Sequence, residues 1–137
     1  MYNPAIVQPM REELVNAGFQ ELTDEAAVDA ALKDSTGTVL VVVNSVCGCA
    51  AGGARPGVIA SLQGAKKPEK LTTVFAGQDK EATERARSYF TGYPPSSPAV
   101  GLLKDGKLVH MVERQGIEGH SPEQIAANLQ AAYEQHC

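Results

Sequence analysis

The sequence predicts an α/β protein in which a central mixed sheet of four or five strands carries helices on both faces. The apolar run from Thr38 to Val43 does not alternate with polar residues, which indicates a strand buried on both faces and therefore a central position. Segments with strand and helix character alternate along much of the chain, as in parallel β-α units. Near the C-terminal end, Asp105-Gly106 separates two short apolar segments, which is a strong signal for a β-hairpin.

The first part of the chain is expected to contain helices on either side of a short strand. A helix over residues 9–18 would end at Gly18, and residues 19–22 would form a brief edge strand. Thr23 is expected to cap a helix over residues 24–33, whose first turn is acidic and therefore complements the helix dipole. The strand over residues 38–43 follows, because β-branched side chains dominate it.

The second part of the chain continues this pattern and ends in a hairpin and a helix. The expected elements are a helix over 50–63 interrupted by Gly52, Gly53 and Pro56, a strand over 71–76, an amphipathic helix over 79–90, a loop over 93–98, hairpin strands over 99–103 and 107–112, and a helix capped by Ser121 with Pro122 first, running to about Tyr133. No internal repeat or linker interrupts the order, so residues 1–137 are expected to form a single domain.

Composition excludes several classes of function. The 12 basic and 16 acidic side chains form no basic stripe, so we expect no nucleic-acid partner. No segment approaches the roughly 20 apolar residues of a membrane span, so no membrane association is expected. The N-terminal segment lacks the basic and long apolar regions of a secretory signal. Because the 3 cysteines are an odd number and two of them are too close together to close a useful loop, a reducing compartment is expected, namely the cytoplasm.

The apolar strand leads directly to the motif Cys47-Gly48-Cys49, followed by a segment with helical character. A helix N-terminus presents free N–H groups and a dipole that favours a thiolate. We therefore expect Cys47 to be the nucleophile of a disulfide exchange and Cys49 to be the resolving thiol. Gly48 tolerates the unusual backbone of the small ring that a disulfide between its neighbours would close. Such a disulfide is expected to be strained and easily reduced.

Other interpretations of the motif remain open at this point. The pair is half of a zinc or iron–sulfur site if two further ligands join it, and the candidates are His110, His120, His136 and Cys137. None of these forms a second short ligand pair, so no metal is assigned. Two buried structural thiols, or a redox-sensing module without turnover, are further alternatives. At the last residue, an inert terminal thiol is favoured over a third redox partner.

The residues after the motif are unusually small. The segment 49–57 is rich in glycine and alanine but lacks the Gly-Lys-Ser/Thr ending of a phosphate-binding loop. Its low surface is expected to let another backbone, a thiol cofactor or a substrate chain approach closely. Arg55 lies about two turns beyond Cys47, so we expect it to support an anionic sulfur or a substrate carboxylate, with an ordinary exposed arginine as the alternative.

The run Asn44-Ser-Val-Cys47-Gly-Cys49-Ala-Ala-Gly-Gly-Ala-Arg55-Pro56 resembles the signature of the bacilliredoxins, thioredoxin-like proteins with a Cys-Gly-Cys active site. Residues 9–14, 18–19, 93–98 and 104–107 are also similar to that family, as is the terminal cysteine, whereas Gly53 stands where a larger polar residue is expected. The resemblance implies a thioredoxin-like fold and removal of bacillithiol from mixed disulfides on cytoplasmic proteins. It further implies bacillithiol as the thiol co-substrate without a tightly bound cofactor, and weak disulfide isomerase or reductase activity.

The resemblance also gives a role to the loop before the hairpin. In thioredoxin-like folds a cis-proline begins the strand that faces the cysteines, and Pro98 lies 8 residues before Gly106, as that proline would. The backbone of the preceding residue, Ser97, is then implied to bind an extended substrate. The expected substrate-binding residues are thus Gly48, Arg55, Ser97 and Pro98. Two departures from thioredoxin itself are the absence of tryptophan and the one-residue spacing of the cysteines.

Overall fold

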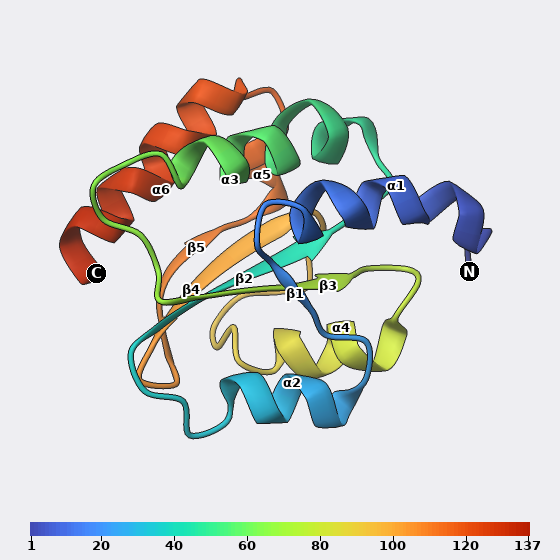
Figure 1. The fold of residues 1–137 in the computed structure, drawn as a ribbon, viewed down its shortest axis with the longest axis horizontal. Helices are drawn as coiled ribbons and strands as arrows, with labels where there is room; N and C mark the ends of the chain where they lie inside the picture. Colours follow the sequence, from blue (N-terminus) through green and yellow to red (C-terminus); the bar gives the residue numbers. More distant parts are fainter.

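The centre of the molecule is a five-stranded mixed sheet with the order β1-β3-β2-β4-β5, seen in a computed structural model that describes residues 1–137 (Figure 1). The strands are β1 (Gln20–Glu21), β2 (Thr38–Asn44), β3 (Lys70–Phe75), β4 (Ala99–Lys104) and β5 (Lys107–Val112). β2 pairs in parallel with β3 and antiparallel with β4, and all of its residues are buried. The predicted central position of this strand is therefore confirmed, as is the predicted edge position of β1.

Helices cover both faces of the sheet, as predicted (Figure 1). One layer contains α1 (Pro4–Val15), α3 (Arg55–Ser61), α5 (Arg114–Ile117) and α6 (Pro122–His136); the other contains α2 (Glu25–Leu32) and α4 (Lys80–Arg87). The side chains of β2 divide between the layers, since Leu40 and Val42 pack with the first and Val39, Val41 and Val43 with the second. The uninterrupted apolar character of this strand follows from its two buried faces.

Local capping residues decide where the helices begin, and they differ from the predictions in two places. α1 begins at Pro4 rather than at Pro9, because the Asn3 side chain accepts a hydrogen bond from the N–H of Ala5 and a proline fits the first turn. α2 is capped by Asp24 rather than by Thr23. The predicted cap of α6 at Ser121 is confirmed, and it forms a complete capping box.

The pairing of β2 with β4 brings the cysteine motif and the proline loop to the same end of the sheet. Val43 is opposite Ala99 in this antiparallel pair, so the segment that leaves β2 lies beside the segment that enters β4. The hairpin after β4 turns at Asp105-Gly106, where both residues have positive φ angles of 52° and 79°, as its predicted tight turn requires.

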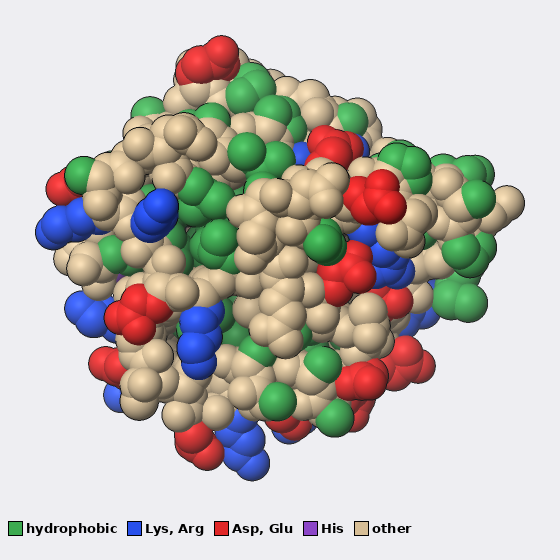
Figure 2. All heavy atoms as spheres, in the orientation of Figure 1, with side chains coloured by type: hydrophobic (Ala, Val, Ile, Leu, Met, Phe, Trp, Pro, Cys, Tyr) green, Lys and Arg blue, Asp and Glu red, His purple; other side chains and the backbone are tan.

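The surface carries exposed apolar side chains where α1 begins. Met1, Tyr2 and Ile6 are exposed, and Figure 2 shows hydrophobic side chains gathered at this end of the molecule. No helix here combines the length and the apolar character that a membrane crossing requires.

Candidate active site

The two cysteines lie where the chain passes from β2 into a helical segment, as the sequence predicts. The carbonyl of Cys47 accepts hydrogen bonds from the N–H groups of Ala50 (3.1 Å) and Ala51 (3.2 Å), so Cys47 occupies the position that caps this segment. The segment continues as a π-helical turn, η1 (Ala50–Ala54), and then as α3. Such π-helical turns are rare and are found frequently at functional sites.

The two thiols are free, partly buried and directly opposed, with their sulfur atoms 2.7 Å apart. Burial alone would raise the pKa of Cys47, but hydrogen bonds from the Cys49 thiol, the Ser45 hydroxyl and the backbone N–H groups of Ala50 and Cys49 outweigh it and lower this pKa. Burial, together with the hydrogen bond to Cys47 and the charge of its thiolate, raises the pKa of Cys49. The environment of the pair therefore favours the thiolate at Cys47 over the thiolate at Cys49.

A buried polar network supports the turn that carries Cys47. The Ser45 hydroxyl accepts a hydrogen bond from the N–H of Cys47 (3.3 Å), and the Ser45 N–H donates to Asn44 Oδ1 (2.8 Å). Arg55 Nη1 donates both to Asn44 Oδ1 (2.9 Å) and to the Ser45 carbonyl (2.8 Å), while Arg55 Nε pairs with Glu13 (3.0 Å). Sequence reasoning missed Ser45, although a hydroxyl residue two positions before a reactive cysteine is a usable signal.

The prediction for Arg55 needs correction. Its side chain is neither exposed nor turned toward a substrate, since the residue is only 1% exposed and its donors bind groups of β2, the following turn and α1. Burial of a guanidinium requires such partners. Arg55 is therefore a positioning residue for the cysteine-bearing turn, and a substrate carboxylate has no access to it.

The peptide bond between Ser97 and Pro98 is cis, as the family resemblance implies. The register of β2 and β4 places this bond beside the residues that lead to the cysteines. The Ser97 carbonyl accepts a hydrogen bond from Arg114 Nη1 (3.0 Å). Substrate binding by Ser97, Pro98 and Gly48 stays a prediction.

The glycines in and after the motif lie in two different environments. A Cβ atom at Gly57 would lie 2.8 Å from the Ile125 side chain, and one at Gly53 would lie 3.3 Å from the same side chain, so these two residues allow α6 to pack closely. Nothing lies within 4 Å of the Cβ position at Gly48 or Gly52. The close approach that the small residues were expected to allow is therefore made by α6, at Gly53 and Gly57. The surface at Gly48 remains open.

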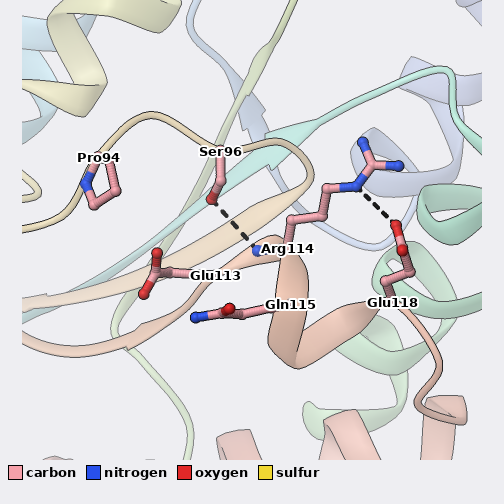
Figure 3. A pocket seen from close by; sticks show the side chains of 6 residues that line it. All are labelled: Pro94, Ser96, Glu113, Arg114, Gln115 and Glu118. Carbon is pink, nitrogen blue, oxygen red and sulfur yellow. Dashed lines mark hydrogen bonds and ion pairs between the residues drawn. The ribbon is translucent and has the colours of Figure 1, made fainter.

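Arg114 is a site residue that the sequence did not reveal. It begins α5, a short helix that was not predicted and whose Ile117 packs beside Gly53 of the cysteine-bearing segment. Arg114 Nε pairs with Glu118 (2.9 Å), and Figure 3 shows this pair at the edge of a pocket. The bond to Glu118, and then the charges of Cys49 and Cys47, raise the pKa of Arg114, so its guanidinium is within electrostatic reach of both sulfurs. The only signal in the sequence is an Arg-Glu pair four residues apart.

The other residues considered as metal ligands do not complete a metal site with the cysteine pair. No group of three or more His, Cys, Asp or Glu side chains is arranged to hold a metal ion. Tyr133, near the end of α6, bonds Ser61 at the end of α3, whereas the cysteine motif precedes the start of α3. The exposed Cys137 follows α6 and is therefore remote from the cysteine pair.

Comparison with known proteins identifies relatives along nearly the whole chain. A family model described as disulphide isomerase matches residues 2–137. A bacilliredoxin of Bacillus cereus is 61% identical over 132 residues, covering 96% of this chain and 91% of its own. A bacilliredoxin of Koribacter versatilis is 54% identical over 137 residues, covering 100% of this chain and 94% of its own.

Solved structures of thioredoxins share the fold. Reduced Schistosoma mansoni thioredoxin pre-protein matches with a TM-score of 0.59 at 16% identity, covering 85% of this chain and 96% of its own. Fasciola hepatica thioredoxin matches with a TM-score of 0.57 at 19% identity, covering 87% of this chain and 100% of its own. The predicted thioredoxin-like architecture is thus confirmed. With its paired thiols on this fold and its close relatives, the chain is a thiol–disulfide oxidoreductase and belongs to the bacilliredoxin family.

Proposed function

We propose that this protein removes bacillithiol from mixed disulfides on cytoplasmic proteins, using bacillithiol as its low-molecular-weight thiol and no tightly bound cofactor. The observation that carries the exchange chemistry is the thiol pair itself: the two sulfur atoms lie 2.7 Å apart, and the pKa of Cys47 is lowered while that of Cys49 is raised. The name bacilliredoxin, borne by relatives at 54% and 61% identity, supports the choice of thiol.

The first step is attack of the Cys47 thiolate on the bacillithiol sulfur of the mixed disulfide. A disulfide forms between Cys47 and bacillithiol as the original disulfide breaks, and the electron pair leaves on the target protein's cysteine, which takes up a proton from water. No net oxidation occurs in this exchange. The hydrogen bonds that lower the pKa of Cys47 favour the thiolate that this attack requires.

The second step uses Cys49, whose sulfur is 2.7 Å from that of Cys47. Cys49 loses its proton and attacks Cys47 Sγ, so that bacillithiol leaves as a thiolate and is protonated. The resulting Cys47–Cys49 disulfide then needs two electrons from a further thiol reductant to restore the dithiol. The same chemistry on protein disulfides would give weak isomerase or reductase activity.

The choice of thiol is tested by the rate of release from one target protein carrying either bacillithiol or glutathione on the same cysteine. We expect a higher kcat/KM for the bacillithiol adduct. An equal or higher value for the glutathione adduct would contradict the assignment of bacillithiol. Cys137→Ser is the matched control, since a remote and exposed thiol should not alter either rate.

A further inference from the structure

A polar pocket of about 430 Å³ lies between the loop that precedes the cis-proline and α5, and it has no role in the steps above. Six residues line it, and none has an apolar side chain apart from Pro94: Pro94, Ser96, Glu113, Arg114, Gln115 and Glu118 (Figure 3). Two connections tie the pocket to the active site. Arg114 Nη1 donates to the carbonyl that precedes the cis-proline, and α5 packs through Ile117 against the segment that follows the cysteines.

We propose that this pocket binds the polar, carboxylate-bearing part of the low-molecular-weight thiol while the thiol's sulfur is bonded to Cys47, with Arg114 as the carboxylate-binding residue. The inference rests on the proposed function and extends it from the sulfur atoms to the remainder of the small thiol.

The hydrogen bonds of Arg114 leave part of its guanidinium free to bind a ligand. Nε is occupied by Glu118 and Nη1 by the Ser97 carbonyl, whereas Nη2 has no hydrogen-bond partner within the protein. The side chains of Arg114 and Glu118 are 46% and 61% exposed, so a ligand carboxylate can reach the guanidinium without unfolding any element. A guanidinium has five N–H donors and binds carboxylates in a fixed planar geometry.

The other lining residues favour a small polar conjugate over an apolar peptide segment. Ser96 and Gln115 offer donors and acceptors for hydroxyl and amide groups. Glu113 and Glu118 can accept hydrogen bonds from hydroxyl or ammonium groups, so the pocket suits a thiol that carries such groups beside its carboxylate. An extended target peptide remains the competing occupant, and the test below separates the two.

The test measures adduct formation on Cys47 in a Cys49→Ala background, which holds the adduct in place. The full-length protein is equilibrated with 3,3′-dithiodipropionate or with 2-hydroxyethyl disulfide. In each case the Cys47 thiolate displaces one half of the reagent as a thiolate and keeps the other half as a mixed disulfide. Intact-mass spectrometry gives the two equilibrium constants, and their ratio reports the preference for a carboxylate over a hydroxyl.

Adding Arg114→Gln is expected to lower this ratio about threefold to tenfold, the range expected for one charge-assisted hydrogen bond at an exposed site. Arg114→Lys should retain part of the preference, and Glu118→Gln should increase it, because the guanidinium is then released from its partner. Arg85→Gln is the matched control, since Arg85 is also an exposed arginine paired with a carboxylate, but on α4 in the opposite layer. Its ratio should not change.

An unchanged ratio in Arg114→Gln, or a decrease in Glu118→Gln, would overturn the proposal and leave the pocket to a target peptide. The measurement requires only a reactive Cys47 and contains no bacillithiol. Failure of the proposed function would appear instead as a lack of preference for the bacillithiol adduct in the release assay, with the carboxylate selectivity still dependent on Arg114.

Discussion

Replacing Arg55 by methionine tests whether this buried guanidinium supports the cysteine-bearing turn. The substitution removes the donor to the Ser45 carbonyl and one of the two donors to Asn44 Oδ1. Without Arg55, the buried Ser45 carbonyl loses this donor, which costs about 1–3 kcal/mol. Asn44 Oδ1 keeps its bond from the Ser45 N–H and loses only one hydrogen bond, worth about 1 kcal/mol. The free energy of unfolding should therefore fall by about 2–4 kcal/mol.

The partner Glu13 provides the control. Its side chain is 44% exposed, so Glu13→Gln should lower the free energy of unfolding by less than about 1 kcal/mol, although it breaks the ion pair of the same arginine. Urea unfolding of the two variants measures the difference. The comparison requires that the free energy of unfolding falls with urea concentration at the same slope in both variants. In parallel, alkylation of Cys47 by iodoacetamide should slow in Arg55→Met, because the turn that supplies its hydrogen bonds is less ordered.

An equal loss of unfolding free energy in the two variants would show that Arg55 stabilises the protein through its ion pair with Glu13 and not through its hydrogen bonds to the turn. Destabilisation without any change in Cys47 alkylation would refute the positioning role.

Further predictions concern the thiolate and the packing behind it. Ser45→Ala removes one of the hydrogen bonds that lower the pKa of Cys47, so this pKa should rise and the midpoint of the alkylation rate should move to higher pH; a midpoint that stays in place would exclude the hydroxyl as a contributor. Gly57→Ala should lower the free energy of unfolding by about 1–3 kcal/mol because the new methyl group overlaps Ile125, as measured by urea unfolding. Gly52→Ala, where space is open, should be neutral or stabilising, and equal effects of the two glycine variants would contradict the packing argument.

Much of the fold could be predicted from the sequence because its strongest signals are local. The apolar run of β2, the Asp105-Gly106 turn and the Ser121 cap each depend on a few neighbouring residues, and all three predictions are confirmed. The start of α1 differs from its prediction because two prolines compete for the first position, and the Asn3 cap favours the earlier one. α5 is not predicted because a helix of 4 residues shows no apolar periodicity.

Local signals in the sequence could predict only part of the candidate site. The cysteine motif is contiguous, and its position between a strand and a helix follows from the pattern around it. Closeness to the cysteines along the chain pointed to Arg55 and not to Arg114, and it could not show how either side chain is placed. Burial decides between them: Arg55 is enclosed beneath the turn, whereas Arg114 is delivered to the site by a segment 65 positions after Cys49. That assignment requires the long-range packing of α5 against η1.

The division of labour between the two cysteines is the central claim, and trapping the exchange intermediate tests it most directly. Cys49→Ala protein is mixed with a bacillithiolated target, and the site of modification is located by mass spectrometry of its peptides. We expect stoichiometric bacillithiol on Cys47 and release of the target thiol, with no adduct in the matched Cys47→Ala variant. Full exchange activity in Cys47→Ala, or an adduct on Cys49 in that variant at the wild-type rate, would contradict the assignment of Cys47 as the nucleophile.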